Sequence, residues 1–450
     1  MVERVIAPEV NRLIGEKRFD EIKKIIQPLR AEDIATLISE IEESSGKILV
    51  FRLIPADKII DVFENLDPDP QKDILSALSD EKAREILNEM APDERTELFE
   101  EIPGELVKKF LNLLTPHERS ISTELLGYPP ESVGRLVTPE FVQLYESMTV
   151  AKALEHIRAV GLSTEIIYHC YVLDQAKQLI GFVSLKKLVL ADPQKKISEV
   201  MKRDVIKVNV YTDREEAAQI FKKYDLLALP VVDSNNKLLG IVTFDDFVDV
   251  LEAEATEDFE KIAAVLPVDK PYMEAGFFEI VWKRSFWLLV LLALESLSGF
   301  VLSNYSATIT RTVALTFFLP ILIGTGGNAG TQSATVIIRS LATGQIQPFE
   351  FFRVVLREAG IGVLLGVILA VFGLIRAFLQ QGDWWLSMAV GISMGITIVL
   401  STTVGASLPL IFRRFKVDPA LMSGPLITTI VDVVGIAIYF EIAQVLLRLN

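Results

Sequence analysis

The chain has 450 residues and is acidic overall, with 45 basic and 60 acidic side chains, but its two parts differ sharply. Residues 1–281 hold 34 basic and 53 acidic residues, a net charge of −19, whereas residues 282–450 hold 11 and 7, a net charge of +4. So negative a region repels nucleic acid and favours cations as partners, and the single cysteine, Cys170, excludes an internal disulfide and is typical of a reducing compartment.

Residues 1–131 contain an internal repeat of twelve residues. Most units have proline at their first or second position, often followed by acids; apolar pairs recur in the first five units, and each unit closes on an apolar residue. Proline and acids together are typical of a helix start. The units begin at Pro55, Asp67, Ser79, Ala91, Pro103 and Thr115. The pattern predicts an all-α superhelix of short stacked helices.

Residues 132–255 contain a different repeat. The segment 181–189 recurs as 240–248, and each copy is predicted to have the order strand, helix, strand, strand, helix. This α/β arrangement resembles a tandem pair of CBS domains. The resemblance implies an adenine nucleotide such as ATP, held in the second copy by Thr243 and Asp246. The alternative for these two residues is an ordinary helix cap.

The first copy departs from the nucleotide-binding pattern of CBS domains. It has Ser184, but Lys187 stands where the pattern has aspartate. A nucleotide site in the first copy is therefore doubtful.

An acidic run begins near the end of the second copy and leads into a linking helix region, residues 256–281. Between Asp245 and Glu260 eight acidic residues occur without a basic one. Like charges three and four residues apart on a helix repel each other, and divalent cations with oxygen ligands would relieve the repulsion. The alternative is a solvated helix face.

Residues 282–450 are predicted to form an α-helical membrane domain with five spans. Each apolar stretch is long enough to cross about 30 Å of hydrocarbon. The stretches are Ser285–Ser303, Thr312–Ile338, Val354–Leu379, Trp384–Phe412 and Leu421–Leu447. Five spans place the termini on opposite sides. With the acidic half in the cytosol, most loop arginines and lysines also lie inside, as the positive-inside rule requires, and the C-terminus lies outside.

The second and fifth spans carry polar features. Residues 324–333 of the second span are rich in glycine and amides, and irregular backbone at membrane depth needs protein or a water-filled cavity to satisfy it. In the fifth span, Gly424, Thr428, Asp432 and Gly435 share one face. A carboxylate such as that of Asp432 costs about 2.5–3.5 kcal/mol at membrane depth and suggests cation binding. The alternative is an ion pair with a basic residue on a neighbouring helix.

Two other acids occur in the membrane domain. Glu295 lies deep in the first span, and Glu358 lies near the inner end of the third. Each is interpreted as an interfacial residue or an ion-pair partner rather than as a cation site.

The whole chain resembles the MgtE family of magnesium channels. A helical superhelix, a CBS pair, an acidic linking helix and five spans occur in that order, and the most specific motifs lie in residues 320–335 and 418–435. The resemblance implies a plasma-membrane homodimer with one pore on the two-fold axis, lined by the second and fifth spans. The ion-selecting acid of the family falls on Asp432, and Thr428, Gly424 and Asn328 are further expected pore residues.

The resemblance also implies gating by intracellular Mg²⁺, which closes the pore when it binds to the acidic cytosolic domains. The matching positions are Asp93 and Glu97 in the superhelix, Asp213, Glu215 and Asp225 in the second CBS copy, and Asp246, Asp249, Glu254, Glu257 and Asp258 along the acidic run.

Two other functions remain open from the sequence. A carrier or exchanger for Co²⁺, Mn²⁺ or another divalent cation would use the same acids. A membrane enzyme regulated by nucleotide is the more distant alternative. No enzyme is expected, because the three histidines are widely spaced and no phosphate-cradling loop precedes a helix.

Overall fold

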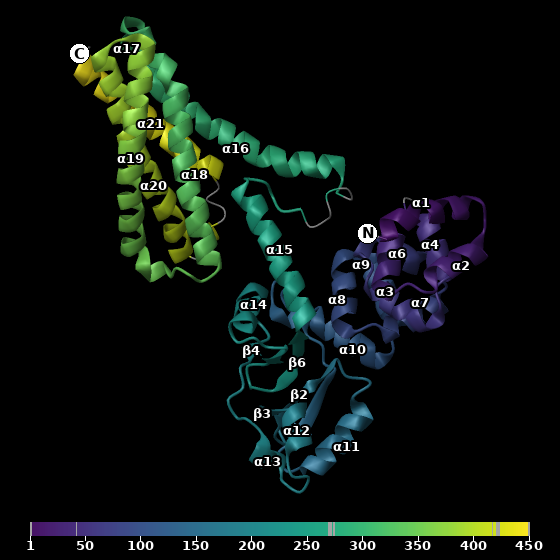
Figure 1. Ribbon diagram of the computed structural model, residues 1–450. Helices are drawn as coiled ribbons and strands as arrows, with labels where there is room; N and C mark the ends of the chain where they lie inside the picture. The colour runs from purple at the N-terminus through teal and green to yellow at the C-terminus, as the bar shows by residue number, and fades with distance from the viewer. Residues whose placement is uncertain are drawn as a thin grey trace. The chain divides into compact units, whose positions relative to one another are not determined.

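The computed structural model describes residues 2–41, 43–268, 272, 275–415, 417–419 and 424–448 (Figure 1). The chain divides into two compact units, Met1–Leu251 and Glu252–Asn450.

The first unit begins with ten short α-helices that form the expected superhelix. Helices α6 to α10 start twelve residues apart, and Pro68, Pro92 and Pro116 each occupy a first helical position. Each helix from α3 to α8 packs against the second helix after it. The helices are α1 Val2–Gly15, α2 Phe19–Ile26, α3 Ala31–Ser39, α4 Ser44–Arg52, η1 Ala56–Lys58, α5 Ile59–Glu64, α6 Pro68–Ala77, α7 Asp80–Glu89, α8 Pro92–Glu101, α9 Gly104–Leu113 and α10 Pro116–Leu125.

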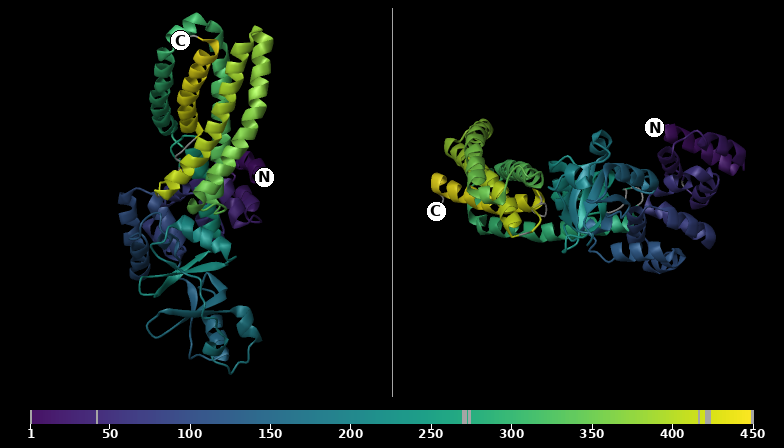
Figure 2. Two further views of the ribbon diagram at one scale, coloured as in Figure 1. Left: turned by 90° about the vertical axis from the view of Figure 1, so that its left-hand side faces the viewer. Right: turned by 90° about the horizontal axis from the view of Figure 1, so that it is seen from below.

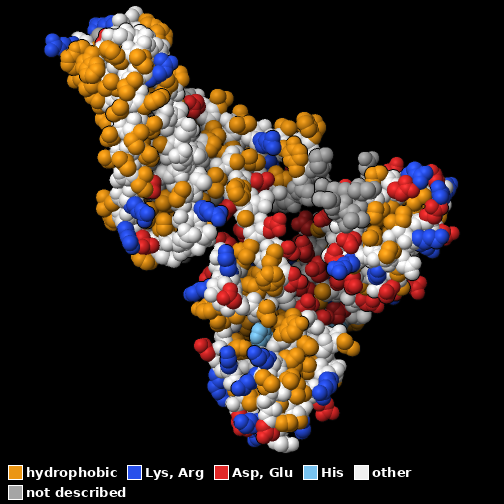
Figure 3. Space-filling model, in the orientation of Figure 1, with side chains coloured by type: hydrophobic (Ala, Val, Ile, Leu, Met, Phe, Trp, Pro, Cys, Tyr) orange, Lys and Arg blue, Asp and Glu red, His pale blue; other side chains and the backbone are white. Residues whose placement is uncertain are grey.

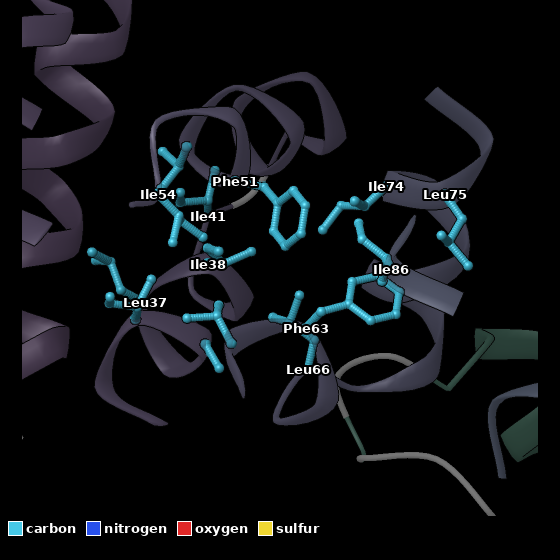
Figure 4. Close-up of a cluster of buried hydrophobic side chains, with 14 of the residues drawn as sticks. Leu37, Ile38, Ile41, Phe51, Ile54, Phe63, Leu66, Ile74, Leu75 and Ile86 are labelled. Carbon is cyan, nitrogen blue, oxygen red and sulfur yellow. The ribbon is translucent and has the colours of Figure 1, made fainter. Parts of the chain in front are cut away.

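The core of this superhelix is apolar and continuous. The apolar pairs of the repeat point inward from successive helices, as Figure 4 shows for Phe63, Ile74, Leu75 and Ile86. The Phe63 ring meets the Phe51 ring edge to face, with centroids 5.8 Å apart. The repeat therefore specifies one core across many short helices, none of which would be stable alone.

One fully buried charge joins α7, α8 and α10. The guanidinium of Arg95 donates hydrogen bonds to Ser122 Oγ at 2.8 Å and to the carbonyl oxygens of Leu87 and Met90. It also forms an ion pair with Glu118 at 2.5 Å. Because a buried guanidinium needs acceptors for its N–H groups, Arg95 ties the three helices together.

The two CBS copies have the predicted order of strands and helices. Each copy forms a three-stranded sheet whose first two strands are parallel and whose last two are antiparallel. Side chains of both sheets share one buried cluster, which includes Tyr171, Ala228 and Ile241. The elements are η2 Val133–Leu136, β1 Phe141–Tyr145, α11 Val150–Val160, β2 Ile166–Leu173, β3 Leu179–Ser184, α12 Leu185–Leu190, α13 Ile197–Val200, β4 Val208–Asn209, α14 Arg214–Lys223, β5 Ala228–Val232 and β6 Leu238–Thr243.

The acidic run forms one helix, α15, from Phe244 to Ile262. It starts directly after β6 and continues past residues 251 and 252, where the two compact units meet. The boundary expected between residues 255 and 256 thus falls inside a continuous helix.

The second unit contains five helices long and apolar enough to cross a membrane, which confirms a helical membrane domain with five candidate spans. Residues 421–423 of the fifth expected span lie outside the described residues. Helices α18 to α21 lie side by side (Figures 1 and 2). The elements are α16 Phe277–Asn304, α17 Ser306–Arg311, η3 Val313–Phe318, α18 Leu319–Ala342, η4 Pro348–Glu350, α19 Phe351–Gln381, α20 Trp384–Arg414 and α21 Gly424–Leu447.

The glycine-rich segment of the second span is regular helix. Helix α18 runs through it without interruption, and Pro320 lies in the first turn, where no intrahelical hydrogen bond is lost. A Cβ on Gly405 of α20 would lie 2.3 Å from the carbonyl oxygen of Gly330, and a Cβ on Gly330 would lie 2.9 Å from Ile427 of α21. The glycines therefore serve close packing of α18 against α20 and α21.

The Arg95 contacts predict a marked loss of stability in Glu118→Ala. We expect the free energy of unfolding of the superhelix to fall by about 2–4 kcal/mol, because the substitution leaves a buried guanidinium without its counter-ion. Hydrogen exchange of the α7, α8 and α10 amides in the full chain measures this change. The control is Asp80→Ala, which removes a solvent-exposed ion pair with Lys109 and should cost less than about 1 kcal/mol. Equal effects of the two substitutions would contradict the assigned role of Arg95.

Candidate cation-binding sites

Asp432 lies inside the bundle of membrane helices, on α21. Its side chain is only 7% exposed, and its Oδ1 atom accepts no hydrogen bond from any described group. No ion pair joins it to a described lysine or arginine. Among the described residues, no basic residue on a neighbouring helix therefore forms the ion pair with Asp432 that the alternative interpretation requires. A buried carboxylate oxygen without a donor is available to a cation or to its hydration water.

The other expected pore residues lie on α18 and α21. A Cβ on Gly327 would lie 2.8 Å from Thr428, and a Cβ on Gly424 would lie 2.8 Å from Thr331, so the two helices are in close contact along these positions. The Thr428 hydroxyl donates to the carbonyl oxygen of Pro425 at 2.7 Å. Asn328 is exposed on α18. The structure thus groups Gly424 and Thr428 with Asp432 on one helix, packed on α18.

Glu295 and Glu358 both accept hydrogen bonds from neighbouring helices. Thr429 Oγ1, on α21, lies 3.5 Å from Glu295 Oε2, on α16. Ser333 Oγ, on α18, lies 2.7 Å from Glu358 Oε2, on α19. Neither acid forms an ion pair within the described part of the chain. Both acids therefore belong to polar contacts between spans.

The first unit contains a cluster of carboxylates that we name the α8–α15 cluster. It is composed of Asp93, Glu94 and Glu97 from α8 and Asp245, Asp246 and Asp249 from the start of α15. Asp93 interacts electrostatically with Asp246, and Glu97 with Asp249. Acidic side chains gather in this region in Figure 3. Glu94 and Asp245 were not among the expected site residues, although both lie within the acidic segments that contain the others.

Four carboxylates of the α8–α15 cluster have raised pKa values. Burial raises the pKa of Glu94 to about 8, and Glu97 and Glu64 add to the shift. Burial raises the pKa of Asp246 to about 6, against two hydrogen bonds from Thr243 that lower it. Burial and the charge of Asp246 raise the pKa of Asp93, and burial and the charge of Asp249 raise that of Glu97. Packed carboxylates with raised pKa values are stabilised either by protons or by cations.

A second group, which we name the Lys261 cluster, lies in the second unit. It is composed of Glu254, Glu257, Asp258 and Lys261 from α15 and Asp418 from the segment before α21. The Lys261 ammonium lies 2.6 Å from Glu257 and 2.7 Å from Asp418. Burial and the charge of Asp418 raise the pKa of Asp258 to about 6. Lys261 thus supplies part of the positive charge that these acids require. Neither Lys261 nor Asp418 was among the expected site residues.

Two of the expected metal ligands also have other positions in the fold. Asp213 caps α14 by accepting hydrogen bonds from the backbone N–H groups of Glu215 and Glu216. Asp225 lines a cavity between the CBS copies. Among the described residues, no three histidine, cysteine or acidic side chains are placed closely enough to hold one metal ion together.

Thr243 and Asp246 bind each other at the junction of β6 and α15. Asp246 Oδ2 accepts hydrogen bonds from the backbone N–H of Thr243 at 2.9 Å and from its hydroxyl at 2.8 Å. The bond from the Thr243 backbone N–H to Asp246 is the reach-back half of a capping box, which favours the helix-cap alternative for the pair. Neither residue lines the cavity that contains Asp225.

The cavity between the CBS copies combines aromatic and basic side chains. Its volume is about 550 Å³. The rings of His169 and Phe182 meet edge to face at 5.6 Å, and the Lys202 ammonium lies 5.8 Å from the Phe182 ring. Its lining includes His169, Tyr171, Phe182, Lys202, Arg203 and Asp225. This site was not among the expected ones, although aromatic residues on β2 and β3 followed by Lys202-Arg203 were a signal for it.

Comparison with known proteins decides the family. The chain is 36% identical to the magnesium transporter MgtE of Thermus thermophilus over 99% of this chain and 100% of that protein. The chain belongs to the MgtE family. It is also 33% identical to the magnesium transporter MgtE of Bacillus subtilis, over 96% of this chain and 95% of that protein.

The three parts of the MgtE architecture match separately. Residues 319–442 match the divalent cation transporter family MgtE, residues 29–131 match the MgtE intracellular N domain, and residues 133–193 and 197–253 match CBS domains. The chain is therefore a multi-pass membrane protein with a cytosolic N-terminal domain.

Two solved structures resemble the cytosolic part of this MgtE chain. One is the cytosolic domain of the Mg²⁺ channel MgtE in complex with ATP, which is 32% identical, covers 54% of this chain and 99% of that one, and gives a TM-score of 0.51. The other is the soluble part of a magnesium transporter, which is 29% identical, covers 56% of this chain and 99% of that one, and gives a TM-score of 0.50.

The raised pKa values predict that the cytosolic unit of this MgtE protein loses stability as pH rises when divalent cations are absent. A folded pKa of about 8 for Glu94, against an ordinary value of 4.5, means that its protonated form stabilises the fold. That stabilisation is complete below pH 4.5 and is lost as pH rises through about 8. Calorimetry of the full chain in EDTA should therefore show a falling melting temperature over this range. Mg²⁺ should remove most of the fall.

Glu94→Gln provides the control for this prediction. The amide keeps the shape of the side chain but does not ionise, so its melting temperature should depend less on pH in EDTA. A fall of equal size with and without Mg²⁺ would show that the cluster does not bind the ion.

Proposed function

We propose that this protein is a Mg²⁺-selective channel that mediates magnesium uptake across the plasma membrane. The observation that carries the proposal is Asp432, a carboxylate inside the membrane helices without an ion pair among the described residues. The names of the Thermus and Bacillus relatives support Mg²⁺ as the ion. The working form is a homodimer with one pore, lined by α18 and α21 of both chains, with the C-terminus outside.

The residues at the proposed pore suit a hydrated ion. Mg²⁺ gives up its water shell reluctantly and is bound by few direct carboxylates. Asp432 supplies charge, while Thr428, Gly424 and Asn328 supply small or neutral polar groups for water. A carrier for Co²⁺ or Mn²⁺ would use the same carboxylate, and the relative flux of the three ions distinguishes it from a Mg²⁺ channel.

Intracellular Mg²⁺ gates this channel in our proposal. The α8–α15 cluster brings like charges together at a cost that bound cations lower. High Mg²⁺ then favours the compact cytosolic arrangement and the closed pore, and low Mg²⁺ lets the acids repel one another and the pore open. Asp93, Glu97, Asp246 and Asp249 contribute from the first unit. The mechanism fails if Mg²⁺ does not offset the loss of stability at high pH.

Further along α15, Glu254, Glu257 and Asp258 bind the same ion beside the membrane domain. The raised pKa of Asp258 supports this assignment, because crowded carboxylates there also need positive charge. Asp213, Glu215 and Asp225 are assigned to peripheral Mg²⁺ binding on the second CBS copy.

Asp432→Asn should lower Mg²⁺ uptake into proteoliposomes by about 30–100-fold, because a contact to a charged group is worth about 2–3 kcal/mol. The amide keeps the size of the side chain, so folding is retained. The control is Glu441→Gln on the same helix, where the acid is exposed and accepts a hydrogen bond from Tyr305 at 2.9 Å. Its uptake should stay within about twofold of the wild type. Unchanged uptake in Asp432→Asn would move the ion site elsewhere.

The cavity between the CBS copies supports a second binding function, for ATP. Phe182 offers an aromatic surface for the adenine ring, and Lys202 and Arg203 offer charge for phosphate. The relative crystallised with ATP supports this ligand class. Burial and the charge of Lys202 lower the pKa of His169, so that side chain favours its neutral form.

Substitutions distinguish this cavity from the site expected at Thr243 and Asp246. Arg203→Gln should weaken ATP binding by about tenfold, because a charge-assisted contact to phosphate is lost. Thr243→Val should leave the affinity unchanged, since this hydroxyl already binds Asp246. Isothermal titration of the full chain with ATP measures both. The reverse order of effects would favour the second CBS copy as the ATP site.

A further inference from the structure

Helix α20 carries a row of hydroxyl groups at membrane depth. Ser393, Thr397 and Ser401 are spaced four residues apart and therefore share one face of the helix. All three side chains are at most 1% exposed. None of their hydroxyl oxygens has a hydrogen-bond partner among the described protein groups.

Other hydroxyls on the same helix behave differently. Thr403 donates to the carbonyl oxygen of Val399 at 2.6 Å, and Ser407 donates to that of Val404 at 3.2 Å. Binding to a carbonyl of the preceding turn is the usual way for a serine or threonine to satisfy its hydroxyl within a helix. The row formed by Ser393, Thr397 and Ser401 does not use it. A buried hydroxyl without a partner is costly and requires an explanation.

The row faces the segment of α21 that carries Asp432. A Cβ on Gly435, one turn after Asp432, would lie 3.2 Å from Thr397 Cγ2 and 3.7 Å from its hydroxyl oxygen. A Cβ on Gly326 of α18 would lie 2.9 Å from Thr397 and 3.5 Å from Ser401 Oγ. Helices α18, α20 and α21 pack together in this region (Figure 1). The three hydroxyls and Asp432 Oδ1, which have no hydrogen-bond partner among the described residues, thus lie on two helices of this junction.

We propose that Ser393, Thr397 and Ser401 extend the Asp432 site into α20 and bind the hydration water of the divalent cation held there. The inference rests on the proposed function, because it assigns specificity to residues around the same carboxylate. Hydroxyl groups both donate and accept hydrogen bonds and carry no charge. They can therefore match the water shell that Mg²⁺ retains without trapping the ion.

Close helix packing is the competing explanation for small polar residues between membrane helices. It makes a different prediction for Thr397→Val, which keeps the shape of the side chain and removes only the unpaired hydroxyl. If the residue serves packing alone, stability is unchanged or higher and transport is unaffected. If the hydroxyl binds hydration water, transport falls although stability does not.

The test measures uptake of Mg²⁺ and, separately, of Mn²⁺ by the full chain in proteoliposomes. Thr397→Val should lower Mg²⁺ uptake by about five- to tenfold, the effect of about one hydrogen bond. Mn²⁺ uptake should fall less, because Mn²⁺ exchanges its water more readily, so the ratio of the two fluxes should change. Thr397→Ser should restore both. The matched control is Thr403→Val, which removes a hydroxyl already bound within the helix and should change neither flux.

Each result decides the inference. Ser393→Ala and Ser401→Ala carry the same test if Thr397→Val does not fold. Unchanged Mg²⁺ uptake and an unchanged flux ratio in these variants, with uptake abolished in Asp432→Asn, would overturn the role of α20 alone. An equal loss in Thr403→Val would also overturn it, because the loss would then reflect general damage to the helix. Normal uptake in Asp432→Asn would instead remove the proposed function itself.

Discussion

A carboxylate inside an apolar helical bundle must be stabilised by something that the bundle supplies or admits. For Asp432 no lysine or arginine among the described residues does so, and one of its oxygens has no donor at all. The surrounding packing follows from this constraint. Glycines on α18 and α21 bring three helices close together, and the hydroxyl groups of α20 face the same junction. The membrane domain thus keeps a small polar interior in a region where the cost of polar groups is high.

The cytosolic unit also packs carboxylates together, and it contains more of them than the membrane helices do. Asp93, Glu94 and Asp246 lie close enough to hinder one another's ionisation, as their raised pKa values indicate. Such an arrangement is sensitive to cations because their binding removes a cost that the fold already bears. In the Lys261 cluster a lysine meets part of the same need. Carboxylates are therefore the candidate cation ligands in both units.

The fold could be predicted largely from periodicity. The twelve-residue repeat fixed the starts of α6 to α10, and duplication fixed the order of elements in the CBS copies. The length of the apolar stretches located the five membrane helices. These features depend on local pattern, which the sequence displays directly. The regular helix through residues 324–333 could not be foreseen, because it depends on how closely Gly330 and Gly405 approach.

The sites were harder to predict than the fold. Asp432 stood out because a single charge in an apolar stretch is conspicuous. The hydroxyl row of α20 did not, since serine and threonine are common in membrane helices and only tertiary packing shows which hydroxyls lack a partner. Thr243 and Asp246 fitted a nucleotide motif by spacing, yet the contact between them could be seen only in three dimensions. The cavity lined by Phe182 and Arg203 is formed by residues of both CBS copies, so no single segment of the sequence indicates it.

Helix α15 has a mechanical consequence. It has 19 residues without a break, and it begins in one compact unit and ends in the other. A rod of about 28 Å that tilts by about 10° displaces its far end by about 5 Å, close to one helical turn. In the gating that we propose, such a rod would convert a small rearrangement among the carboxylates at its base into a larger displacement of its far end. Shortening α15, or inserting flexible residues within it, would then uncouple cation binding from movement of the membrane helices while leaving both units folded.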